Sequence, residues 1–395
     1  MYKFHTLKEV KVKGKRVLVR EDLNVPMQAG NILDYKRIDA ALETLRYLSD
    51  HDAKTIVVSH LGRPDGKVVE KYSLRPVAGA LAERLHIAVT FASDVVGPSA
   101  HEAVEAMHDG DIVMLENVRF EPGEEQNDPH FAQQLAQLAD LYVNDAFGTA
   151  HRAHASTEGV AHLLPSYAGF LMQTEIEALT KLVDNPQQPY VCVIGGAKIK
   201  DKVGVFSKLI EKVHAFCIGG GMANTFLAAK GIDVGKSLRD DDLEPAKAIM
   251  ELARPRDVSI LLPIDAVVSS SFDNDAGAHI VDLAQVNDQM ILDIGPKTAA
   301  EYASVIETAR TVVFNGPMGV YEKPPYREGT RAIGEAMKKA TQAGATTVVG
   351  GGDAAAAAEE LKFAEYVTHV STGGGATLEF LEGKELPGIN ALERA

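Results

Sequence analysis

The sequence predicts an α/β protein built from two doubly wound parallel-sheet domains. Short β-rich runs alternate with segments of helical periodicity from one end of the chain to the other, which is typical of βαβ units with helices on both faces of a parallel sheet. The chain has 395 residues, and because domains of about 150 residues are common, this length favours two domains. Apolar residues make up 46% of the chain, enough to build substantial cores. We therefore expect two Rossmann-like domains.

The first series of strands and helices is assigned to an N-terminal domain, residues 1–172. Helical segments, such as residues 35–49 and 130–139, separate its strands. The predicted strands are residues 16–20, 55–59, 88–91, 112–116 and 141–145.

A single amphipathic helix is expected to join the two domains. The segment QTEIEALTKLVDNPQQP, residues 173–189, has helical periodicity and ends in an Asn-Pro stop and a Gln/Pro-rich turn. We therefore assign residues 173–188 to a long hinge helix and linker, and residues 189–375 to a C-terminal domain. The strands predicted there are residues 190–194, 215–218, 259–263, 311–314, 346–349 and 367–370.

Charge and composition argue against several classes of protein. A formal net charge of −15 argues against general binding to nucleic acid or to anionic membranes. No stretch approaches the roughly 18 consecutive apolar residues of a membrane span, and the N-terminus lacks the apolar region of a signal peptide. Cys192 and Cys217 lie in apolar runs without metal-binding spacing. We expect a soluble cytoplasmic protein, and a monomer, because no heptad repeat or exposed apolar helix stands out.

The turns that follow the strands differ in chemistry between the two halves. Those of the first half carry Arg, His and Asn, whereas those of the second half are rich in glycine. Ligands of open α/β sheets bind at the carboxyl ends of the strands, so each half is expected to form one ligand site. Converging arginines suit a small ligand with more than one anionic group. Glycine-rich turns let backbone N–H groups approach a phosphate, which predicts a nucleotide site.

A polyanion site facing a nucleotide site suggests phosphoryl transfer, which depends on positioning and charge stabilisation rather than on a covalent nucleophile. The sequence agrees, because it contains no nucleophile elbow, HExxH or active-site cysteine motif. Residues 231–237, GIDVGKS, are one residue too short for a P-loop, which excludes that motif. His151 and His154 have a spacing that could seat a metal on a helix, but they lack a nearby carboxylate, and we expect no metal there.

Two other functions stay open on the residues alone. Residues 350–355, GGGDAA, fit the GxGxxA dinucleotide fingerprint, so an NAD-dependent oxidoreductase is an alternative that nicotinamide binding would reveal. A non-catalytic scaffold that kept the fold is the other alternative, and it would be expected to have lost one of four residues. Those residues, Arg37, Lys198, Lys202 and Asp353, are all present.

Seven motifs, in order along the chain, resemble those of the phosphoglycerate kinase family. The likeness runs from about residue 14 to residue 388. The motifs are REDLNVP at 20–26, SHLGRP at 59–64, LENVRF at 115–120, AHRAH at 150–154, GGAK at 195–198 with Asp201 and Lys202, NGPMG at 315–319 and GGGD at 350–353.

The resemblance implies a reversible glycolytic reaction, in which 1,3-bisphosphoglycerate and MgADP give 3-phosphoglycerate and MgATP. It also implies two doubly wound domains, with residues 376–395 returning to the N-terminal domain, and Mg²⁺ as the cofactor. Because water would hydrolyse an acyl phosphate or ATP, we expect the domains to close over their substrates. The hinge is expected near residues 170–189 and near residues 371–375.

The family's functional residues carry over to matching positions. Those expected to hold phosphoglycerate are Asp22, Leu23, Asn24, Arg37, His60, Leu61, Gly62, Arg63, Arg119 and Arg152. Those expected to hold the nucleotide are Lys202, Gly219, Gly220, Asn315, Glu322, Gly351, Gly352, Asp353 and Ala354.

Some of these residues have a more specific expected role. Asp353 is expected near Mg²⁺ and Glu322 at the ribose, while Arg37, Lys198 and Lys202 stabilise the transferred phosphoryl group. Ala354 departs from the family, which usually has Ser or Thr at this position. The departure removes one possible hydrogen bond to the nucleotide, worth about 0.5–1.5 kcal/mol, and is not expected to abolish activity.

Overall fold

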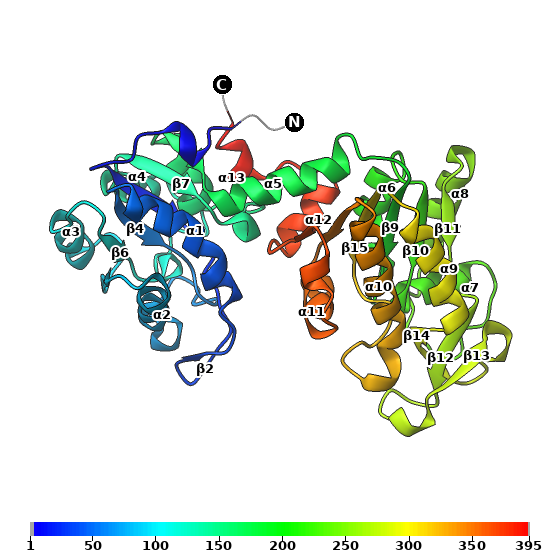
Figure 1. The fold of residues 1–395 in the computed structure, drawn as a ribbon. Coiled ribbons are helices and arrows are strands. Elements are labelled where there is room, and N and C mark those ends of the chain that lie inside the picture. The colour runs from blue at the N-terminus through cyan, green and yellow to red at the C-terminus, as the bar shows by residue number, and fades with distance from the viewer. Residues whose placement is uncertain (1–3, 394–395) are drawn as a thin grey trace. The chain divides into compact units, whose positions relative to one another are not determined.

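The computed structural model describes residues 4–393, which divide into two compact units. Residues 4–177 and 385–393 form the first unit, and residues 178–384 form the second. Each unit contains a six-stranded parallel sheet with helices packed around it (Figure 1). The predicted fold class, α/β with two doubly wound domains, is confirmed.

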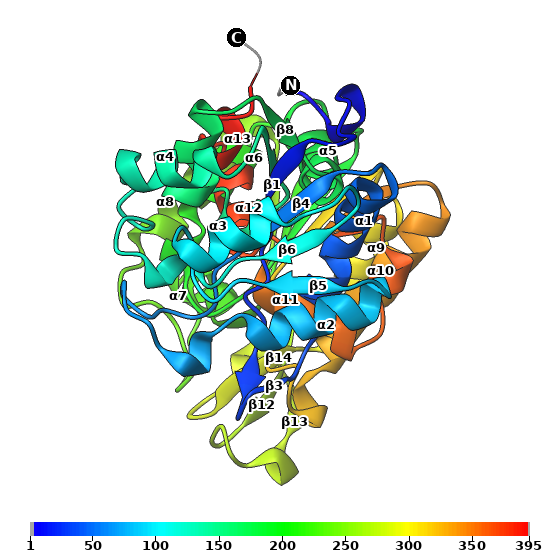
Figure 2. The ribbon, with the colours of Figure 1, turned by 90° about the vertical axis from the view of Figure 1, so that its left-hand side faces the viewer.

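The sheet of the first unit has the strand β1 (Arg16–Arg20) near its centre. The other strands are β4 (Lys54–Val58), β5 (Val89–Phe91), β6 (Ile112–Met114), β7 (Leu141–Asn144) and β8 (Ser166–Ala168). Their order is β5-β6-β4-β1-β7-β8, and Figure 2 shows β1, β4, β6 and β5 side by side. Val17 of β1 is in parallel register with Thr55 of β4 and with Leu141 of β7. Because both faces of such a strand are covered, β1 is a nearly continuous apolar run.

The helices of the first unit lie around this sheet (Figure 1). They are α1 (Lys36–Asp50), α2 (Arg75–Leu85), α3 (Pro98–Glu105), α4 (Pro129–Gln137) and the short C-terminal α13 (Pro387–Asn390). On α1, the buried residues Ile38, Ala41, Leu45 and Leu48 recur at helical spacing. They share one hydrophobic core with Val17 of β1 and with α2. This packing fixes the N-terminal end of α1, which carries Arg37, relative to β1.

Helix α5 (Phe170–Val183) contains the boundary between the two units, at residue 177. Its first turn is anchored in the first unit, where the N–H of Met172 donates to Oδ1 of Asp145 at 3.1 Å. The N–H of Phe170 donates to Oγ1 of Thr44 at 3.0 Å. The helix therefore begins at Phe170, a few residues before the predicted position, because two side chains of the first unit satisfy its N-terminal N–H groups.

The second unit is built on a sheet centred on β9 (Tyr190–Ile194) and β15 (Thr311–Asn315). The other strands are β10 (Ala215–Ile218), β11 (Ser259–Leu261), β16 (Thr346–Val349) and β17 (His369–Val370), in the order β11-β10-β9-β15-β16-β17. The surrounding helices are α6 (Val203–Leu209), α7 (Gly220–Ala229), α8 (Glu244–Ala253), α9 (Pro296–Glu307), α10 (Glu328–Gln342), α11 (Gly352–Glu360) and α12 (Gly375–Leu381). Figure 1 shows α9 and α10 side by side, where they pack against each other.

A second, antiparallel sheet in this unit was missed by the sequence analysis. It has the order β13-β12-β14, formed by β12 (Asp265–Ser269), β13 (His279–Asp282) and β14 (Met290–Ile294). A small hairpin of β2 (Met27–Gln28) and β3 (Asn31–Ile32) in the first unit was missed too, as was β8. β2, β3 and β8 have only two or three residues each, and polar residues such as those of SSSFDNDAG interrupt the antiparallel sheet, so the apolar pattern of these strands is weak.

The return of the chain to the first unit begins later than the predicted residue 376. Helix α12 packs on α6 within the second unit, and its residues Ala376, Thr377, Phe380 and Leu381 are buried. The first unit resumes at Glu385. There the N–H of Gly388 donates to the carbonyl oxygen of Ala150 at 2.9 Å. The burial of α12 in the second unit explains the later return.

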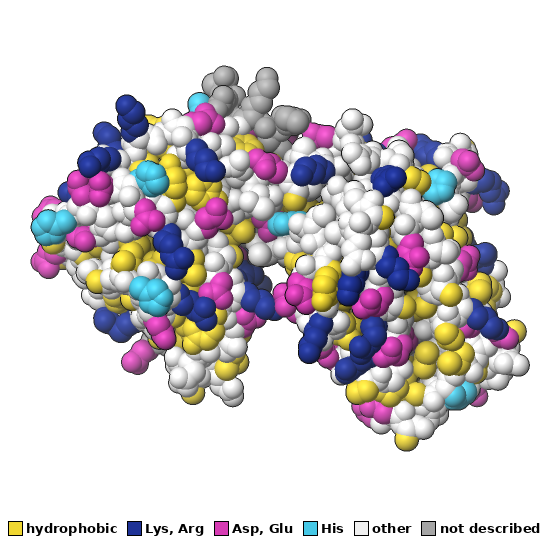
Figure 3. Space-filling model, in the orientation of Figure 1, with side chains coloured by type: hydrophobic (Ala, Val, Ile, Leu, Met, Phe, Trp, Pro, Cys, Tyr) yellow, Lys and Arg dark blue, Asp and Glu magenta, His cyan; other side chains and the backbone are white. Residues whose placement is uncertain are grey.

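On the face that Figure 3 shows, basic side chains are interspersed with acidic ones on each unit. Among the described residues, no helix combines the length and the apolar character that crossing a membrane requires.

Candidate active site

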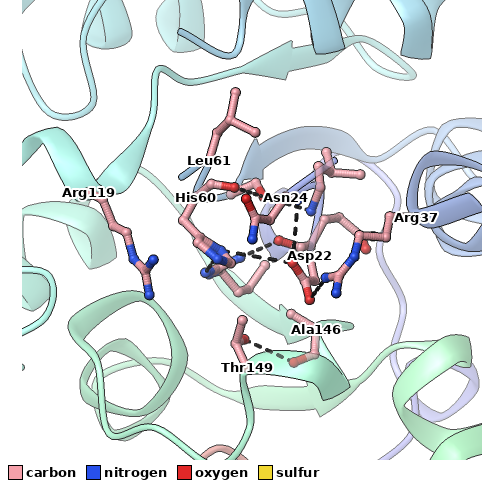
Figure 4. A network of polar contacts seen from close by, with 12 residues as sticks. Asp22, Asn24, Arg37, His60, Leu61, Arg119, Ala146 and Thr149 are labelled. Carbon is pink, nitrogen blue, oxygen red and sulfur yellow. Dashed lines mark hydrogen bonds and ion pairs between the residues drawn. The ribbon is translucent and has the colours of Figure 1, made fainter. Parts of the chain in front are cut away.

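The carboxyl ends of β1 and β4 bring several of the predicted residues together in the first unit (Figure 4). Asp22 and Asn24 follow β1, and His60 follows β4. Arg37, in the first turn of α1, donates from Nη1 to Oδ2 of Asp22. The other carboxylate oxygen of Asp22, Oδ1, lies 4.0 Å from Nδ1 of His60. Asp22 therefore lies between a cation and the imidazole ring.

The segment 61–62 is held in place by side chains from neighbouring turns. Oδ1 of Asn24 accepts a hydrogen bond from the N–H of Gly62 at 2.9 Å. Arg119 donates from Nη1 to the carbonyl oxygen of Gly62 at 2.8 Å. Asn117 bonds both backbone groups of Leu61, with distances of 3.2 Å to its nitrogen and 2.7 Å to its oxygen. Asn117 is a residue that the sequence analysis did not select, although it lies in the motif that contains Arg119.

His60 is buried and surrounded by positive charge. Burial lowers its pKa well below the ordinary value, and Arg20, Arg119, Arg37 and Arg152 lower it further by repelling a protonated ring. Arg20 is close enough to donate from Nη2 to Nδ1 of His60 at 3.2 Å. Because a guanidinium can only donate, Nδ1 is the acceptor and the proton of the neutral ring is on Nε2. The ring therefore offers an N–H donor, not a positive charge.

A buried polar network under the cluster fixes Arg20. Arg20 is 1% exposed and donates from Nε to Oγ of Ser156 at 2.8 Å. Ser156 in turn donates from Oγ to Oε1 of the buried Glu124 at 2.6 Å. His154 lies near the same carboxylate, with its Nδ1 3.8 Å from Oε1 of Glu124. Burial, together with the positive charge of nearby arginines, lowers the pKa of His154 to about 4. These roles do not show in the sequence, because the network joins motifs far apart in the chain.

The remaining residues predicted for this site differ in how the structure places them. Leu23 and Leu61 are buried, and the N–H of Leu23 donates to Oγ of Ser59 at 2.9 Å. Arg152 is half-buried and donates from Nε to Nε2 of His151 at 3.1 Å. Arg63 is exposed, and the contacts described for this cluster do not include it. Its part in the site stays a prediction.

In the second unit, three glycine-rich turns at the ends of β9, β10 and β15 approach one another closely. The N–H of Gly220 donates to the carbonyl oxygen of Met318 at 2.9 Å, and the N–H of Met222 donates to that of Gly196 at 3.0 Å. Gly220 has φ +65°, and a Cβ there would lie 2.7 Å from the oxygen of Gly196. Only glycine satisfies both conditions at the start of α7.

Lys202 lies beneath these turns. Its Nζ donates to the carbonyl oxygens of Gly195 at 2.8 Å and Asn315 at 2.6 Å. Burial lowers its pKa to about 8, while Asp353 and other nearby acidic groups act in the opposite direction. Asn315 donates from Nδ2 to the carbonyl oxygen of Gly350 at 2.7 Å, which ties the turn after β16 to the same point. Lys198, by contrast, is exposed on the turn after β9.

These turns border a cavity of about 590 Å³, a volume typical of small-molecule sites. Gly220, Met318, Glu322 and Asp353 are among its lining residues. The cavity also contains Asp293 of β14, which the sequence analysis did not identify because that strand was not predicted.

Helix α11 starts beside the cavity at Gly352, with Gly351 as its N-cap residue. Gly352 and Asp353 are exposed there, so the first turn is open to a ligand. Ala354 is 1% exposed and belongs to the hydrophobic core of the second unit. Its methyl group therefore faces the core, which makes the departure from Ser or Thr compatible with the packing.

The chain is similar to known proteins along nearly its whole length. A sequence model described as phosphoglycerate kinase matches residues 7–384. The chain is 53% identical over 389 residues to the phosphoglycerate kinase of Moorella thermoacetica, covering 98% of both, and 53% identical over 395 residues to that of Chloroflexus aurantiacus, covering 99% of both.

Solved structures agree with these sequence matches. The structure of phosphoglycerate kinase from Coxiella burnetii superposes with a TM-score of 0.91 at 41% identity, and that from Pyrococcus horikoshii with 0.84 at 33%. Each comparison covers 98% of both chains. The chain therefore belongs to the phosphoglycerate kinase family and has its activity, a phosphoryl transfer of glycolysis.

Proposed function

We propose that the arginine cluster of the first unit holds the phosphoglycerate and that the cavity of the second unit holds the nucleotide. The reaction is the reversible transfer of a phosphoryl group from 1,3-bisphosphoglycerate to MgADP, giving 3-phosphoglycerate and MgATP. The observation that carries this assignment is the approach of Arg20, Arg37, Arg119 and Arg152 to one neutral histidine, His60. A ligand with a phosphate and a carboxylate suits such a cluster, because guanidinium groups bind both with paired hydrogen bonds.

His60 would bind the substrate as a hydrogen-bond donor. Its Nδ1 accepts from Arg20, which leaves Nε2–H for an anionic oxygen. No general base is needed, because the attacking oxygen of ADP, or the carboxylate of 3-phosphoglycerate in reverse, is already ionised. This agrees with the lowered pKa of His60, which keeps the ring neutral.

Arg37 is our candidate for stabilising the transferred phosphoryl group. Its pairing with Asp22 fixes the direction of the guanidinium, while its side chain stays 36% exposed and open to a ligand. Lys198 and Lys202 would supply positive charge from the nucleotide side. Together, these groups would stabilise the charge that spreads over the equatorial phosphoryl oxygens during in-line transfer.

The nucleotide phosphates would bind at the starts of helices α7 and α11. Both helices begin with glycine, so backbone N–H groups are accessible and the positive end of each helix dipole points at the ligand. We assign Gly219, Gly220, Gly351 and Gly352 to this role. Glu322 would accept hydrogen bonds from the ribose, since it lines the same cavity.

Mg²⁺ would enter the site with the nucleotide. Among the described residues, no group of three or more His, Cys, Asp or Glu side chains could hold a metal alone. Asp353 offers one carboxylate at the cavity, and Mg²⁺ in nucleotide sites typically takes one or two carboxylates and fills its shell with phosphate oxygens and water. The residues thus fit an ion carried by the nucleotide, which would neutralise phosphate charge when bound.

We also infer domain closure during turnover, because the two substrates must meet away from water. The hinge would involve residues 170–189 and 371–375. We expect the enzyme to act as a cytoplasmic monomer, and light scattering after size-exclusion chromatography would reveal a larger assembly.

Isothermal titration calorimetry tests the two sites separately. We expect Arg152→Met to weaken binding of 3-phosphoglycerate at least about tenfold and to leave MgADP affinity within about twofold, because one charged contact is lost. Lys202→Met should weaken binding of MgADP at least about tenfold and leave the affinity for 3-phosphoglycerate within about twofold. Each variant is therefore the control for the other. Equal effects of both variants on both ligands would contradict the assignment.

A further inference from the structure

Asp293 is a buried carboxyl group in the wall of the proposed nucleotide cavity. It is the fourth residue of β14, in the antiparallel sheet, and it is 1% exposed. A carboxyl group with so little contact to water is costly unless its oxygens are well bonded. Burial raises its pKa to about 8.

The carboxyl group caps helix α10 from a neighbouring strand. Oδ2 accepts a hydrogen bond from the N–H of Gly329, the second residue of α10, at 2.7 Å. Oδ1 accepts from the N–H of Ile294 at 2.8 Å. The N-cap residue of α10 is Arg327, a residue type outside the usual helix-capping set. Asp293 thus supplies the acceptor that the helix's own N-terminal sequence does not.

Two glycines enclose this carboxyl group on opposite chain segments. A Cβ on Gly319 would lie 2.5 Å from Oδ1 of Asp293, and a Cβ on Gly329 would lie 2.3 Å from the same oxygen. Both distances are too short for any side chain. The carboxyl group is therefore in direct contact with the turn after β15 and with the start of α10.

The turn after β15 forms one wall of the cavity. Met318, Gly319, Val320, Tyr321 and Glu322 all line it. The N–H of Val320 donates to the carbonyl oxygen of Leu292, next to Asp293, at 2.9 Å. The N–H of Met318 donates to Oγ1 of Thr330, on α10, at 3.0 Å. The wall is thus hydrogen-bonded to β14 on one side and to α10 on the other. Asp293 lies on β14 and is itself hydrogen-bonded to α10.

We propose that Asp293 is a positioning residue for the nucleotide, which acts by holding the wall of residues 318–322, and with it Glu322, at the spacing that the nucleoside end requires. This inference rests on the proposed nucleotide site. Asp293 acts through the wall and α10 and needs no contact with the reacting phosphoryl group. Its loss should therefore weaken nucleotide binding while leaving the phosphoglycerate site intact.

Asp265 provides a matched control in the same antiparallel sheet. It is a fully buried carboxyl group on β12, and it caps α9 as Asp293 caps α10. Its oxygens accept from the N–H of Lys297 at 3.0 Å and from the N–H of Thr298 at 2.9 Å. Gly295 is enclosed against it, with a Cβ position 2.2 Å from its carboxyl carbon. Asp265 also accepts from Oγ1 of Thr298 at 2.7 Å, and of the two carboxyl groups only Asp293 lines the cavity.

The test compares steady-state kinetics and thermal unfolding of Asp293→Asn and Asp265→Asn. In each variant the amide keeps one acceptor oxygen and turns an NH₂ group toward a backbone N–H. We expect both to unfold at lower temperature. Only Asp293→Asn should raise the KM for MgATP, by at least about tenfold, because a misplaced wall no longer fits the nucleoside. The KM for 3-phosphoglycerate should stay within about twofold in both variants.

A second variant perturbs the same contact from the other side. Gly319→Ala places a methyl group 2.5 Å from Oδ1 of Asp293 and 2.6 Å from the carbonyl oxygen of Leu292, so the wall has to move away from β14. It should raise the KM for MgATP in the same way, and it serves as the test if Asp293→Asn does not fold. An unchanged KM for MgATP in either folded variant would overturn the positioning role and leave Asp293 a structural cap.

Glu322→Ala separates this inference from the proposed site. If Glu322→Ala raises the KM for MgATP but the Asp293 and Gly319 variants do not, the nucleotide site stands and the positioning role is wrong. If Glu322→Ala has no effect either, the proposed contact of the nucleotide with this wall is wrong, and the inference falls with it.

Discussion

The ammonium nitrogen of Lys202 lies 2.6 Å from the carbonyl oxygen of Asn315, at the end of β15. A second carbonyl oxygen, that of Gly195 at the end of β9, lies 2.8 Å away. The lysine is thus held by the backbone of the two central strands, under the turns that we assign to the nucleotide. Bonds to neutral carbonyl groups orient the charge without neutralising it, so it stays available to a phosphate.

The lowered pKa of Lys202 predicts a pH limit on nucleotide use. Burial brings this pKa to about 8, and a lysine is cationic only below its pKa. We therefore expect kcat/KM for MgADP to fall as the pH rises through about 8, because kcat/KM follows the free enzyme. In Lys202→Arg, kcat/KM for MgADP should no longer fall as the pH rises through about 8, since arginine stays charged. Identical pH profiles of kcat/KM for the wild type and this variant would contradict the prediction.

Arg37→Ala is expected to lower kcat by at least about 10³-fold, because Arg37 would stabilise charge that develops in the transition state. The KM for MgATP should change little, since this arginine lies in the first unit. Arg46→Ala is the matched control: Arg46 lies on the same helix and donates from Nη2 to the carbonyl oxygen of Arg84 at 3.0 Å, at an exposed position. Steady-state kinetics would show Arg37 to be a simple binding residue if the loss were confined to the KM for 3-phosphoglycerate.

Ala354→Ser restores the hydroxyl group that the family usually carries, and we expect kcat to stay within about tenfold of the wild type. The side chain is buried in the core of the second unit, so the hydroxyl would add at most one hydrogen bond of about 0.5–1.5 kcal/mol. A larger gain in kcat would mean that the natural chain is catalytically impaired by Ala354.

Asp293 predicts a pH-dependent difference in the free energy of unfolding. Its pKa is about 8 in the folded protein, and an unfolded aspartate has a pKa of about 3.9, so the folded state holds the proton more tightly. Its contribution to stability is full below about pH 4 and is lost as the pH rises through about 8. Relative to Asp293→Asn, which does not titrate, the wild type should lose at least about 1 kcal/mol over this range. Denaturant unfolding at several pH values measures this difference in the free energy of unfolding. A difference between the two proteins that did not change with pH would contradict the prediction.

Domain closure predicts compaction in solution. Small-angle X-ray scattering should give a smaller radius of gyration with 3-phosphoglycerate and a non-hydrolysable MgATP analogue bound together than with either ligand alone, because closure excludes water from both substrates. If the radius of gyration were the same in all three states, closure would not be part of the mechanism.

The sequence predicts most of the parallel strands because they are short apolar runs followed by distinctive turns, and the missed parallel strand, β8, has only three residues. Strand β1, for example, occupies the predicted residues 16–20. The antiparallel sheet escaped prediction because polar residues lie within and between its strands, and the capping role of Asp293 escaped with it. A contact between β14 and α10 depends on tertiary packing, which hydrophobic periodicity does not describe.

The residues of the candidate site also fall into those that the sequence identifies and those that only the structure reveals. Motifs identify Asp22, His60 and Lys202, because these residues lie at strand ends or helix starts within recognisable turns, whereas Arg37 lies outside the motifs and was assigned from the matching position of the family. Arg20 and Glu124 were not selected, since their importance comes from a buried network that Ser156 completes across more than one hundred residues of chain. Arg63 shows the converse, because its motif selects it and the structure leaves its side chain exposed.

The most direct test of the whole account is the initial rate of ADP formation with MgATP and 3-phosphoglycerate, in the presence of hydroxylamine to trap the acyl phosphate. We expect ADP formation that depends on 3-phosphoglycerate and that Arg37→Ala nearly abolishes. ADP formation that is independent of 3-phosphoglycerate, or that survives in Arg37→Ala, would contradict direct transfer supported by the arginine cluster.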